Sequence, residues 1–299
     1  DDETRARAWE ARLRGVRGGG ERAFVHALSR PALSRQMARL ADARLPRPLL
    51  RALLRAYVRA YRVDLSEAAL PLEGYETFNA FFTRRLREGA RPVPADPGLI
   101  VSPTDSRLQS LGRVPAGARL DQIKGRSYAV EALLGDAQEA AAFTGGVHAT
   151  LYLSPGMYHR VHFPVDGRVV AWRYLPGRLY PVNAMAVRHV EGLFTVNERV
   201  VVTIDSDDVG PVAVVLVGAT NVGRMTLSFA ALTTNAGAPP VAVRLAQPLP
   251  VRRGDELGAF NLGSTVVLLA ADPRLEPAGV REGDIVRMGQ ALFRTSAGR

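Results

Sequence analysis

The chain has no cysteine among its 299 residues. Disulfides, thiolate metal sites and cysteine nucleophiles are therefore excluded, and the absence is compatible with a reducing compartment. Aromatic residues make up only 7% of the sequence, and Lys124 is the single lysine beside many arginines. We ascribe this arginine preference to genome composition rather than to a functional demand for guanidinium groups.

Long hydrophobic runs are also missing. The longest, residues 212–217 and 266–271, are as long as strands, whereas a helix needs roughly 18–20 apolar residues to cross a bilayer. The N-terminus lacks the apolar segment of a signal peptide. We therefore expect a chain that is soluble or peripheral to a membrane and does not span it.

Acidic residues are too few to balance the basic ones. The 39 basic and 29 acidic side chains leave a formal net charge of +10. A surplus of this size favours an anionic partner, such as nucleic acid, anionic lipid or a phosphorylated ligand. No nucleic-acid recognition motif or aromatic stacking platform is visible, so we do not expect a nucleic-acid partner.

The first 95 residues contain helical patterns. We expect helices over 5–17, 21–28, 33–43, 48–62 and 75–86. We expect a domain boundary near residue 95, where three prolines lie within six residues (92, 94 and 97). The segment 48–62 has a wide apolar face, and one basic stripe recurs every four residues: Arg47, Arg51, Arg55 and Arg59. Such a helix lies in a membrane interface or packs on the protein's own core with a solvated arginine face. The helix pattern alone favours the second interpretation.

Residues 96–299 have a different pattern, with short β-branched runs between glycine, proline and aspartate turns. Expected strands are 147–153, 167–174, 199–205, 212–218, 223–229, 241–245, 265–270 and 285–293, with helix near 130–142. Many short strands with turn signals are typical of a β-rich sandwich or barrel-like domain. The expected fold class is α+β, with N-terminal helices over 1–95 and a β-rich catalytic domain over 96–299.

Three polar clusters lie on this framework. Asp105 occupies a tight turn, His159 and His162 share one extended segment, and Ser264 follows Gly263 at the start of an apolar run. Aspartate in a turn and a Gly-Ser step at a strand edge are usually structural. Together, however, Asp, His and Ser are the parts of an activated nucleophile. In a strained turn, the Ser264 hydroxyl can attack the carbonyl of its own preceding peptide bond.

The two histidines also raise the alternative of a metal pair. Side chains alternate along a strand, so residues three apart do not face the same side without a bulge. No third ligand stands at a recognisable spacing, and we therefore expect acid–base use and no metal site.

In these motifs the sequence resembles the phosphatidylserine decarboxylase family over most of its length. The residues that carry the resemblance are Thr77–Arg87 with Arg91-Pro92, Ser102–Asp105, Tyr152–Pro155, Tyr158–His162, Pro176-Gly177 to Asn183, Asn197–Arg199, Val217–Thr220 and Leu262–Thr265. Each motif is weak alone, whereas this many in order are specific.

The resemblance implies a proenzyme that cuts itself between Gly263 and Ser264 into chains 1–263 and 264–299. Asp105 and His162 would activate the Ser264 hydroxyl, and an ester followed by β-elimination would convert residue 264 into an N-terminal pyruvoyl group. That covalent cofactor would form a Schiff base with phosphatidylserine and accept electrons during decarboxylation to phosphatidylethanolamine. His159 is the candidate for proton handling.

The resemblance also favours a membrane role for residues 48–62, because the substrate's head group lies at the bilayer surface. It implies a peripheral protein at the cytoplasmic face of the cell membrane, with phosphatidylserine, an anionic membrane surface and the two chains of one precursor as partners; a homodimer is compatible with it. Three residues depart from the family pattern: Ser106, Met157 and Arg224.

Two other functions stay open at this point. A self-cleaving serine hydrolase would use Ser264 for acyl transfer without forming a pyruvoyl group. A non-enzymatic basic module would bind anionic lipid and carry out no chemistry.

Overall fold

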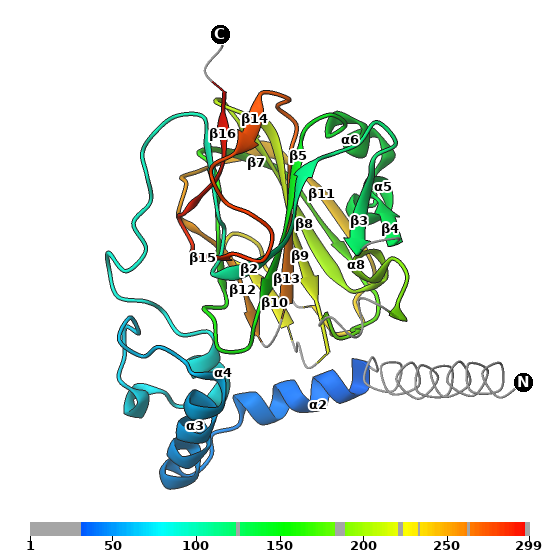
Figure 1. Ribbon diagram of the computed structural model, residues 1–299. Coiled ribbons are helices and arrows are strands. Elements are labelled where there is room, and N and C mark those ends of the chain that lie inside the picture. The colour runs from blue at the N-terminus through cyan, green and yellow to red at the C-terminus, as the bar shows by residue number, and fades with distance from the viewer. Residues whose placement is uncertain are drawn as a thin grey trace, which may run out of the picture.

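The computed structural model describes residues 31–123, 126–182, 189–220, 224–232, 234–261 and 264–296. The helices expected over 5–17 and 21–28 lie outside the described residues, as does Gly263. The described chain starts with helices and continues as a β-rich domain, as Figure 1 shows. The predicted α+β class is confirmed.

Two of the expected helices form with nearly the expected bounds. Helix α2 is Pro31–Asp42 and helix α3 is Arg47–Tyr61. Proline in the first turn of α3 costs no hydrogen bond, because the first N–H groups of a helix have no intrahelical acceptor. The helix ends at Arg62, whose left-handed φ of 51° closes the last turn with a hydrogen bond to Val58.

The prediction of a helix over 75–86 is wrong in extent. A 3₁₀ turn at Leu72–Gly74 (η1) precedes helix α4, which covers only Phe78–Phe82. The Thr77 side chain caps its start by accepting the Ala80 N–H at 3.0 Å. Beyond it the backbone pairs with residues 67–69, where Ala69 N donates to the Arg85 carbonyl at 2.9 Å, so extended pairing replaces the last helical turns.

The helices enclose a hydrophobic cluster of their own. Leu50 and Leu54 of α3 are buried there together with Phe81 of α4. The Tyr57 ring meets Phe78 edge-on with 5.0 Å between ring centroids. Its hydroxyl donates to the Pro155 carbonyl at 2.6 Å and so joins the helices to the β-rich domain.

An eight-stranded antiparallel sheet dominates the β-rich domain. Its order is β11-β7-β8-β9-β13-β5-β2-β15. The bounds are β2 Ser106–Arg113, β5 Val147–Leu153, β7 Gly167–Leu175, β8 Arg199–Ser206, β9 Gly210–Gly218, β11 Val241–Val251, β13 Ser264–Ala270 and β15 Ile285–Val286. Within the described residues, β11 and β15 stand at opposite ends of this order, so the sheet is open and no barrel closes.

Strand β13 is central in this sheet and pairs along its whole length with β9 and β5. All seven of its residues are buried, which means that both faces of the sheet are covered at this position. The unbroken apolar run that follows Ser264 and Thr265 is the pattern that burial on both faces requires.

Three smaller sheets complete the domain: β1-β16-β14, β10-β12-β6 and β3-β4. Their strands are β1 Leu99–Val101, β3 Arg119–Ile123, β4 Arg126–Ala129, β6 Arg160–His162, β10 Arg224–Leu227, β12 Glu256–Asn261, β14 Leu275–Pro277 and β16 Ala291–Thr295. Helices α5 (Val130–Leu134), α6 (Ala137–Ala142) and α8 (Leu193–Val196) lie among them.

The single strand expected over 285–293 is instead two short strands, β15 and β16. The turn between them contains Gly289 with a φ of 85°, where a Cβ atom would come within 2.5 Å of the Pro92 carbonyl oxygen. Only glycine fits this position, and the turn takes the chain from one sheet to another.

Candidate active site

Ser264 is the first residue of β13 and therefore lies at one end of a central strand of the large sheet. Its neighbours across the ladder are Leu153 of β5 and Gly218 of β9. The residue is fully buried, and its hydroxyl finds no hydrogen-bond partner among the described residues. A buried polar group without a partner costs free energy, so its presence calls for an explanation such as a catalytic role. Gly263, the other half of the predicted cleavage site, lies outside the described residues.

Asp105 sits in the turn between β1 and β2. Its carboxylate accepts hydrogen bonds from Arg91 at 2.9 Å (Nε) and 2.5 Å (Nη2), and from the Met288 backbone N–H at 2.9 Å. Arg91 is itself buried and also pairs with Glu67 at 2.8 Å. This bidentate pairing fixes the orientation of the Asp105 carboxylate.

His162 closes strand β6 and is held on both ring nitrogens. Nδ1 lies 2.8 Å from the Gly254 carbonyl, and Nε2 lies 2.9 Å from the Tyr158 hydroxyl. Because a carbonyl only accepts, Nδ1 carries the proton and the Nε2 lone pair accepts from Tyr158. Burial lowers the pKa of His162, while the hydrogen bond to Gly254 opposes the shift, so the neutral, basic form is favoured.

His159 is fully buried two residues after Met157, to whose carbonyl its Nδ1 donates at 2.9 Å. Its ring lies against Phe82 of α4, with 4.0 Å between ring centroids. Nε2 has no hydrogen-bond partner among the described residues. Burial lowers the pKa of His159 to about 3, so the ring is neutral and its Nε2 lone pair can accept a hydrogen bond from a bound molecule.

These four residues come from chain segments that meet at one end of the β domain. The Phe260 N–H donates to the His159 carbonyl at 3.0 Å. Phe260 precedes Ser264 by four residues, so the Cα atoms of Phe260 and Ser264 lie within about 14 Å of each other. The His162 N–H donates to the Pro103 carbonyl at 2.8 Å, which joins its strand to the Asp105 turn.

Among the described residues, no hydrogen bond joins Asp105, His162 and Ser264 to one another. Asp105 is paired with Arg91, and His162 with Tyr158 and Gly254. The assignment of these three residues as a triad therefore stays a prediction.

Sequence reasoning assigned no site role to Tyr158 or Arg91, although both lie in the motifs that carry the family resemblance. The signal that could have found Tyr158 is its spacing, four residues before His162 in the same segment. Arg91 is one of many arginines, and nothing local distinguishes it.

A buried carboxylate also lies at this end of the sheet and was missed as a candidate. Glu198 accepts hydrogen bonds from the Tyr174 hydroxyl and the Asn235 N–H, both at 2.6 Å. Its carbonyl accepts from Gly218, the residue opposite Ser264. Burial raises the pKa of Glu198, and hydrogen bonds from Tyr174 and Asn235 oppose the shift.

The three departures from the family pattern have distinct surroundings. Ser106 begins β2 and is buried. Met157 supplies the carbonyl that accepts from His159 and lines a cavity of about 290 Å³ together with Asp105 and Arg91. Arg224 begins β10 and forms an ion pair with Asp42 of α2 at 2.5 Å.

Comparison with known proteins identifies the family. The sequence model described as phosphatidylserine decarboxylase matches residues 78–294, which include all of the site residues described above. The chain belongs to the phosphatidylserine decarboxylase family. Members of this family that are similar to the chain over nearly their whole length carry the description phosphatidylserine decarboxylase proenzyme.

Two bacterial relatives illustrate the likeness. The chain is 46% identical over 284 residues to the proenzyme of Anaeromyxobacter sp. (strain K), covering 91% of this chain and 98% of that protein. It is 40% identical over 270 residues to the proenzyme of Myxococcus xanthus (strain DK1622), covering 90% and 96%. The predicted family is thereby confirmed.

Proposed function

We propose that the chain is a proenzyme that cleaves itself between Gly263 and Ser264 and then decarboxylates phosphatidylserine to phosphatidylethanolamine. The activity is that of its family, a carboxy-lyase. The observation that carries the self-cleavage is the buried Ser264 hydroxyl, unpartnered among the described residues, at the first position of β13.

Cleavage requires the Ser264 hydroxyl to lose its proton as Oγ bonds to the Gly263 carbonyl carbon. The Nε2 atom of His162 accepts this proton and returns it to the Ser264 nitrogen as the peptide C–N bond breaks, which leaves an ester. Removal of the residue-264 Cα proton then breaks the Cβ–Oγ bond and releases the Gly263 carboxylate. Water replaces the amine of the resulting dehydroalanine, ammonia leaves, and a pyruvoyl group remains.

Asp105 assists this base through its charge. Its carboxylate, held by Arg91, favours the protonated imidazole that forms when His162 takes up the Ser264 proton. Hydrogen bonding of Nδ1 to Gly254 keeps the basic Nε2 lone pair on the side away from that carbonyl.

The surroundings of residue 264 fit a pyruvoyl group. The position is fully buried, its neighbour Gly218 has no side chain, and its oxygen has no competing partner among the described residues. When formed, the group supplies an electron-accepting carbonyl for the substrate amine. His159 has the role of proton donor or acceptor at Nε2, the ring atom that its Met157 hydrogen bond leaves free.

The two chains of the cut precursor stay together in this fold. The small chain begins with β13, which remains hydrogen-bonded on both sides to β5 and β9 of the large chain. Separating the chains would expose the seven buried residues of β13 and break its two full strand ladders, beside the contacts of the rest of the small chain.

Membrane attachment through α2 and α3 is a further part of the proposal. None of the described helices is both long and apolar enough to cross a membrane. Six large apolar side chains are exposed on residues 37–70: Met37, Leu40, Leu49, Leu53, Tyr61 and Leu70. On α3, Leu49 and Leu53 belong to an exposed apolar stripe, which consists of Leu49, Ala52, Leu53, Ala56 and Ala60. Such a stripe beside a row of arginines suits the interface of an anionic bilayer.

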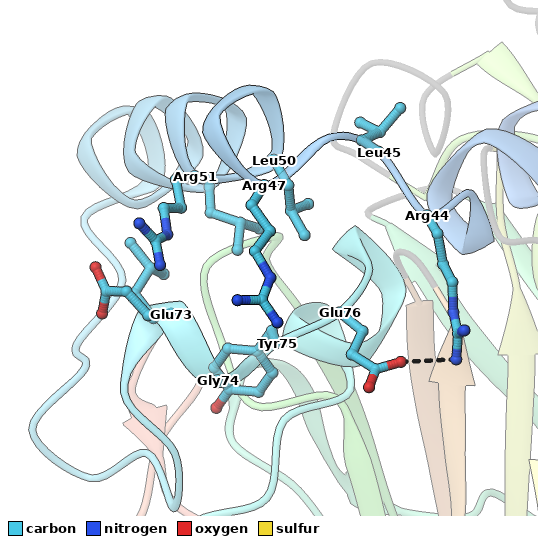
Figure 2. Close-up of a pocket in the computed structure, with 11 residues that line it drawn as sticks. Arg44, Leu45, Arg47, Leu50, Arg51, Glu73, Gly74, Tyr75 and Glu76 are labelled. Carbon is cyan, nitrogen blue, oxygen red and sulfur yellow. Dashed lines mark hydrogen bonds and ion pairs between the residues drawn. The ribbon is translucent and has the colours of Figure 1, made fainter.

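A cavity lined by arginines lies on the packed side of α3, away from this stripe. It has a volume of about 470 Å³ and lies between α3 and residues 72–76. Figure 2 shows Arg47 and Arg51 reaching from α3 toward Tyr75 and Glu73, while Arg44 is bonded to Glu76 at 2.8 Å. Neither Arg47 nor Arg51 has an ion pair within the described residues, so both guanidinium groups are available for lipid phosphates.

Denaturing mass spectrometry of purified protein tests the self-cleavage. We expect fragments matching 1–263 and 264–299, the smaller with a blocked, carbonyl-reactive N-terminus, and a full-length Ser264→Ala variant. Asp105→Asn and His162→Ala should slow cleavage, the latter by about 100-fold or more, as for loss of a general base.

Three outcomes would contradict parts of this proposal. An uncut wild type that decarboxylates phosphatidylserine would refute the mechanism. A cut protein with an ordinary amino group at residue 264 would indicate a self-cleaving hydrolase without a pyruvoyl group. Normal cleavage by both the Asp105 and His162 variants would refute their assignment.

A further inference from the structure

Four residues form a closed hydrogen-bonded ring between the helices and the strands beside Ser264. Asp42 accepts from Arg224 at 2.5 Å and from Asn79 at 2.8 Å. Asn79 also donates to the Asn261 side-chain oxygen at 2.9 Å, and Asn261 donates to the Arg224 carbonyl at 3.1 Å. The ring thus joins α2, α4, β10 and β12.

The strand side of this ring lies next to the predicted cleavage site. Asn261 is the last residue of β12 and Ser264 the first of β13, while Arg224 pairs with Asn261 across the β10–β12 ladder. Asn261 is buried. Only two residues separate Asn261 from Ser264 along the chain, so a partner that holds the Asn261 side chain anchors the chain immediately before the proposed cleavage site.

The helix side of the ring lies next to the lipid-facing surface. Asp42 ends α2, and Leu40, two residues earlier, is 64% exposed. In Figure 1, α2 runs past the ends of β10, β12 and β13. A bilayer that binds Leu40 and Met37 therefore fixes the helix to which the ring is attached.

Stability is a weak explanation for this ring. The side chains of Asp42 and Arg224 are both 39% exposed, and ion pairs at that exposure contribute little to folding because water and salt screen them. A role in alignment suits a contact that contributes little to folding.

We propose that Asp42 and Arg224 are positioning residues that align the Gly263–Ser264 bond for self-cleavage and transmit to it the docking of α2 on an anionic bilayer. The inference rests on the proposed self-cleavage, and it is independent of the later decarboxylation. Small misalignments of reacting atoms cost large factors in rate, so a weak contact has a measurable kinetic effect.

The test compares cleavage rates of freshly synthesised precursor with Asp42→Asn, Arg224→Gln and the double substitution. Each single variant should cleave roughly tenfold more slowly, and the double variant no more slowly than either, because the two residues act through one contact. Arg224→Lys should restore most of the rate. Vesicles containing phosphatidylglycerol should speed cleavage of the wild type but not of the single variants.

Arg44→Gln is the matched control, since it breaks the exposed Arg44–Glu76 pair in the same helical region without touching the ring. Unfolding midpoints in the uncleavable Ser264→Ala background should be unchanged for every variant. Wild-type rates in both single variants, additive effects in the double variant, an equal loss in Arg44→Gln, or equal vesicle acceleration in all proteins would overturn the inference. A wild type that never cuts would instead refute the proposed function.

Discussion

The Tyr158 hydroxyl is hydrogen-bonded to Nε2 of His162, the nitrogen that acts as the base in the proposed mechanism. The hydroxyl oxygen is 2.9 Å from Nε2, and burial raises the pKa of Tyr158 to about 12, so the hydroxyl stays protonated and donates. A donor to Nε2 stabilises the neutral ring and lowers its basicity. Tyr158 is therefore a competitor for the lone pair that accepts the Ser264 proton.

Tyr158→Phe should raise the pKa of His162 by removing that donor. A base works only when deprotonated, so its rate declines as pH falls through its pKa, and this decline should begin at a higher pH in the variant. We expect a displacement of about half to one pH unit, measured as the pH profile of self-cleavage. Tyr75→Phe, which removes a hydroxyl within the helical region, is the control.

The opposite result would assign Tyr158 a different role. If Tyr158→Phe cleaves as slowly as His162→Ala across the whole pH range, the hydroxyl relays the proton instead of competing for it.

At the level of secondary structure elements, α3 has two apolar faces with different environments. Leu50 and Leu54 point into the helical cluster and are buried, whereas Leu49 and Leu53 are 56% and 41% exposed. The sequence pattern merges these leucines into one wide face, because they all recur at helical spacing. Only the position of α4 and residues 72–76 separates the face that packs from the face that is free.

The two faces should respond differently to substitution. Leu49→Ser with Leu53→Ser should weaken binding to anionic vesicles at least tenfold, because each leucine removed from water contributes about 1.5–3 kcal/mol. The same pair should leave the free energy of unfolding within about 1 kcal/mol of wild type. Leu54→Ala should instead cost about 2–5 kcal/mol of stability through cavity formation.

Vesicle flotation and chemical denaturation distinguish these effects. Leu249→Ser, on β11 and 37% exposed, is the control for a general loss of surface hydrophobicity. Equal loss of vesicle binding by the control and the α3 pair would argue against α3 as the lipid-facing helix.

At the scale of the whole molecule, buried histidines make the free energy of unfolding depend on pH. Burial lowers the pKa of His148 to about 4 and that of His159 to about 3. In the unfolded chain both rings bind protons below about pH 6.5. Between these values the unfolded state therefore binds more protons than the folded state, and stability falls as the pH falls.

Each such histidine should add up to about 1.4 kcal/mol per pH unit to this slope. Denaturation of the Ser264→Ala protein from pH 7.5 to pH 4.5 measures the total, to which paired carboxylates also contribute. Adding His148→Gln should reduce the slope of the unfolding free energy against pH between about pH 6 and pH 4.5. The reduction should correspond to nearly one proton fewer taken up on unfolding, because the substituted side chain does not titrate. An unchanged slope would mean that His148 is protonated in the folded protein.

The sequence by itself determined the elements whose patterns are local. Strand β5 has the predicted bounds, and α3 is displaced by one residue, because alternation and helical spacing are set by neighbours within a few positions. Failures occurred where distant chain decided the outcome. Residues 85–87 pair with residues 67–69, which ends the expected helix early, and Gly289 interrupts an expected strand where Pro92 approaches it.

The candidate site was likewise predictable only in part from the sequence. Residue types and motifs identified Asp105, His159, His162 and Ser264 as candidates, since the chemistry of a side chain is visible in its letter. Their partners were not visible: Arg91 for Asp105, Gly254 for His162, and Asp42 for Arg224, which is 182 residues away along the chain. Only the packed structure decides such contacts, because a side chain's hydrogen bonds depend on which distant segments folding brings within about 3 Å of it.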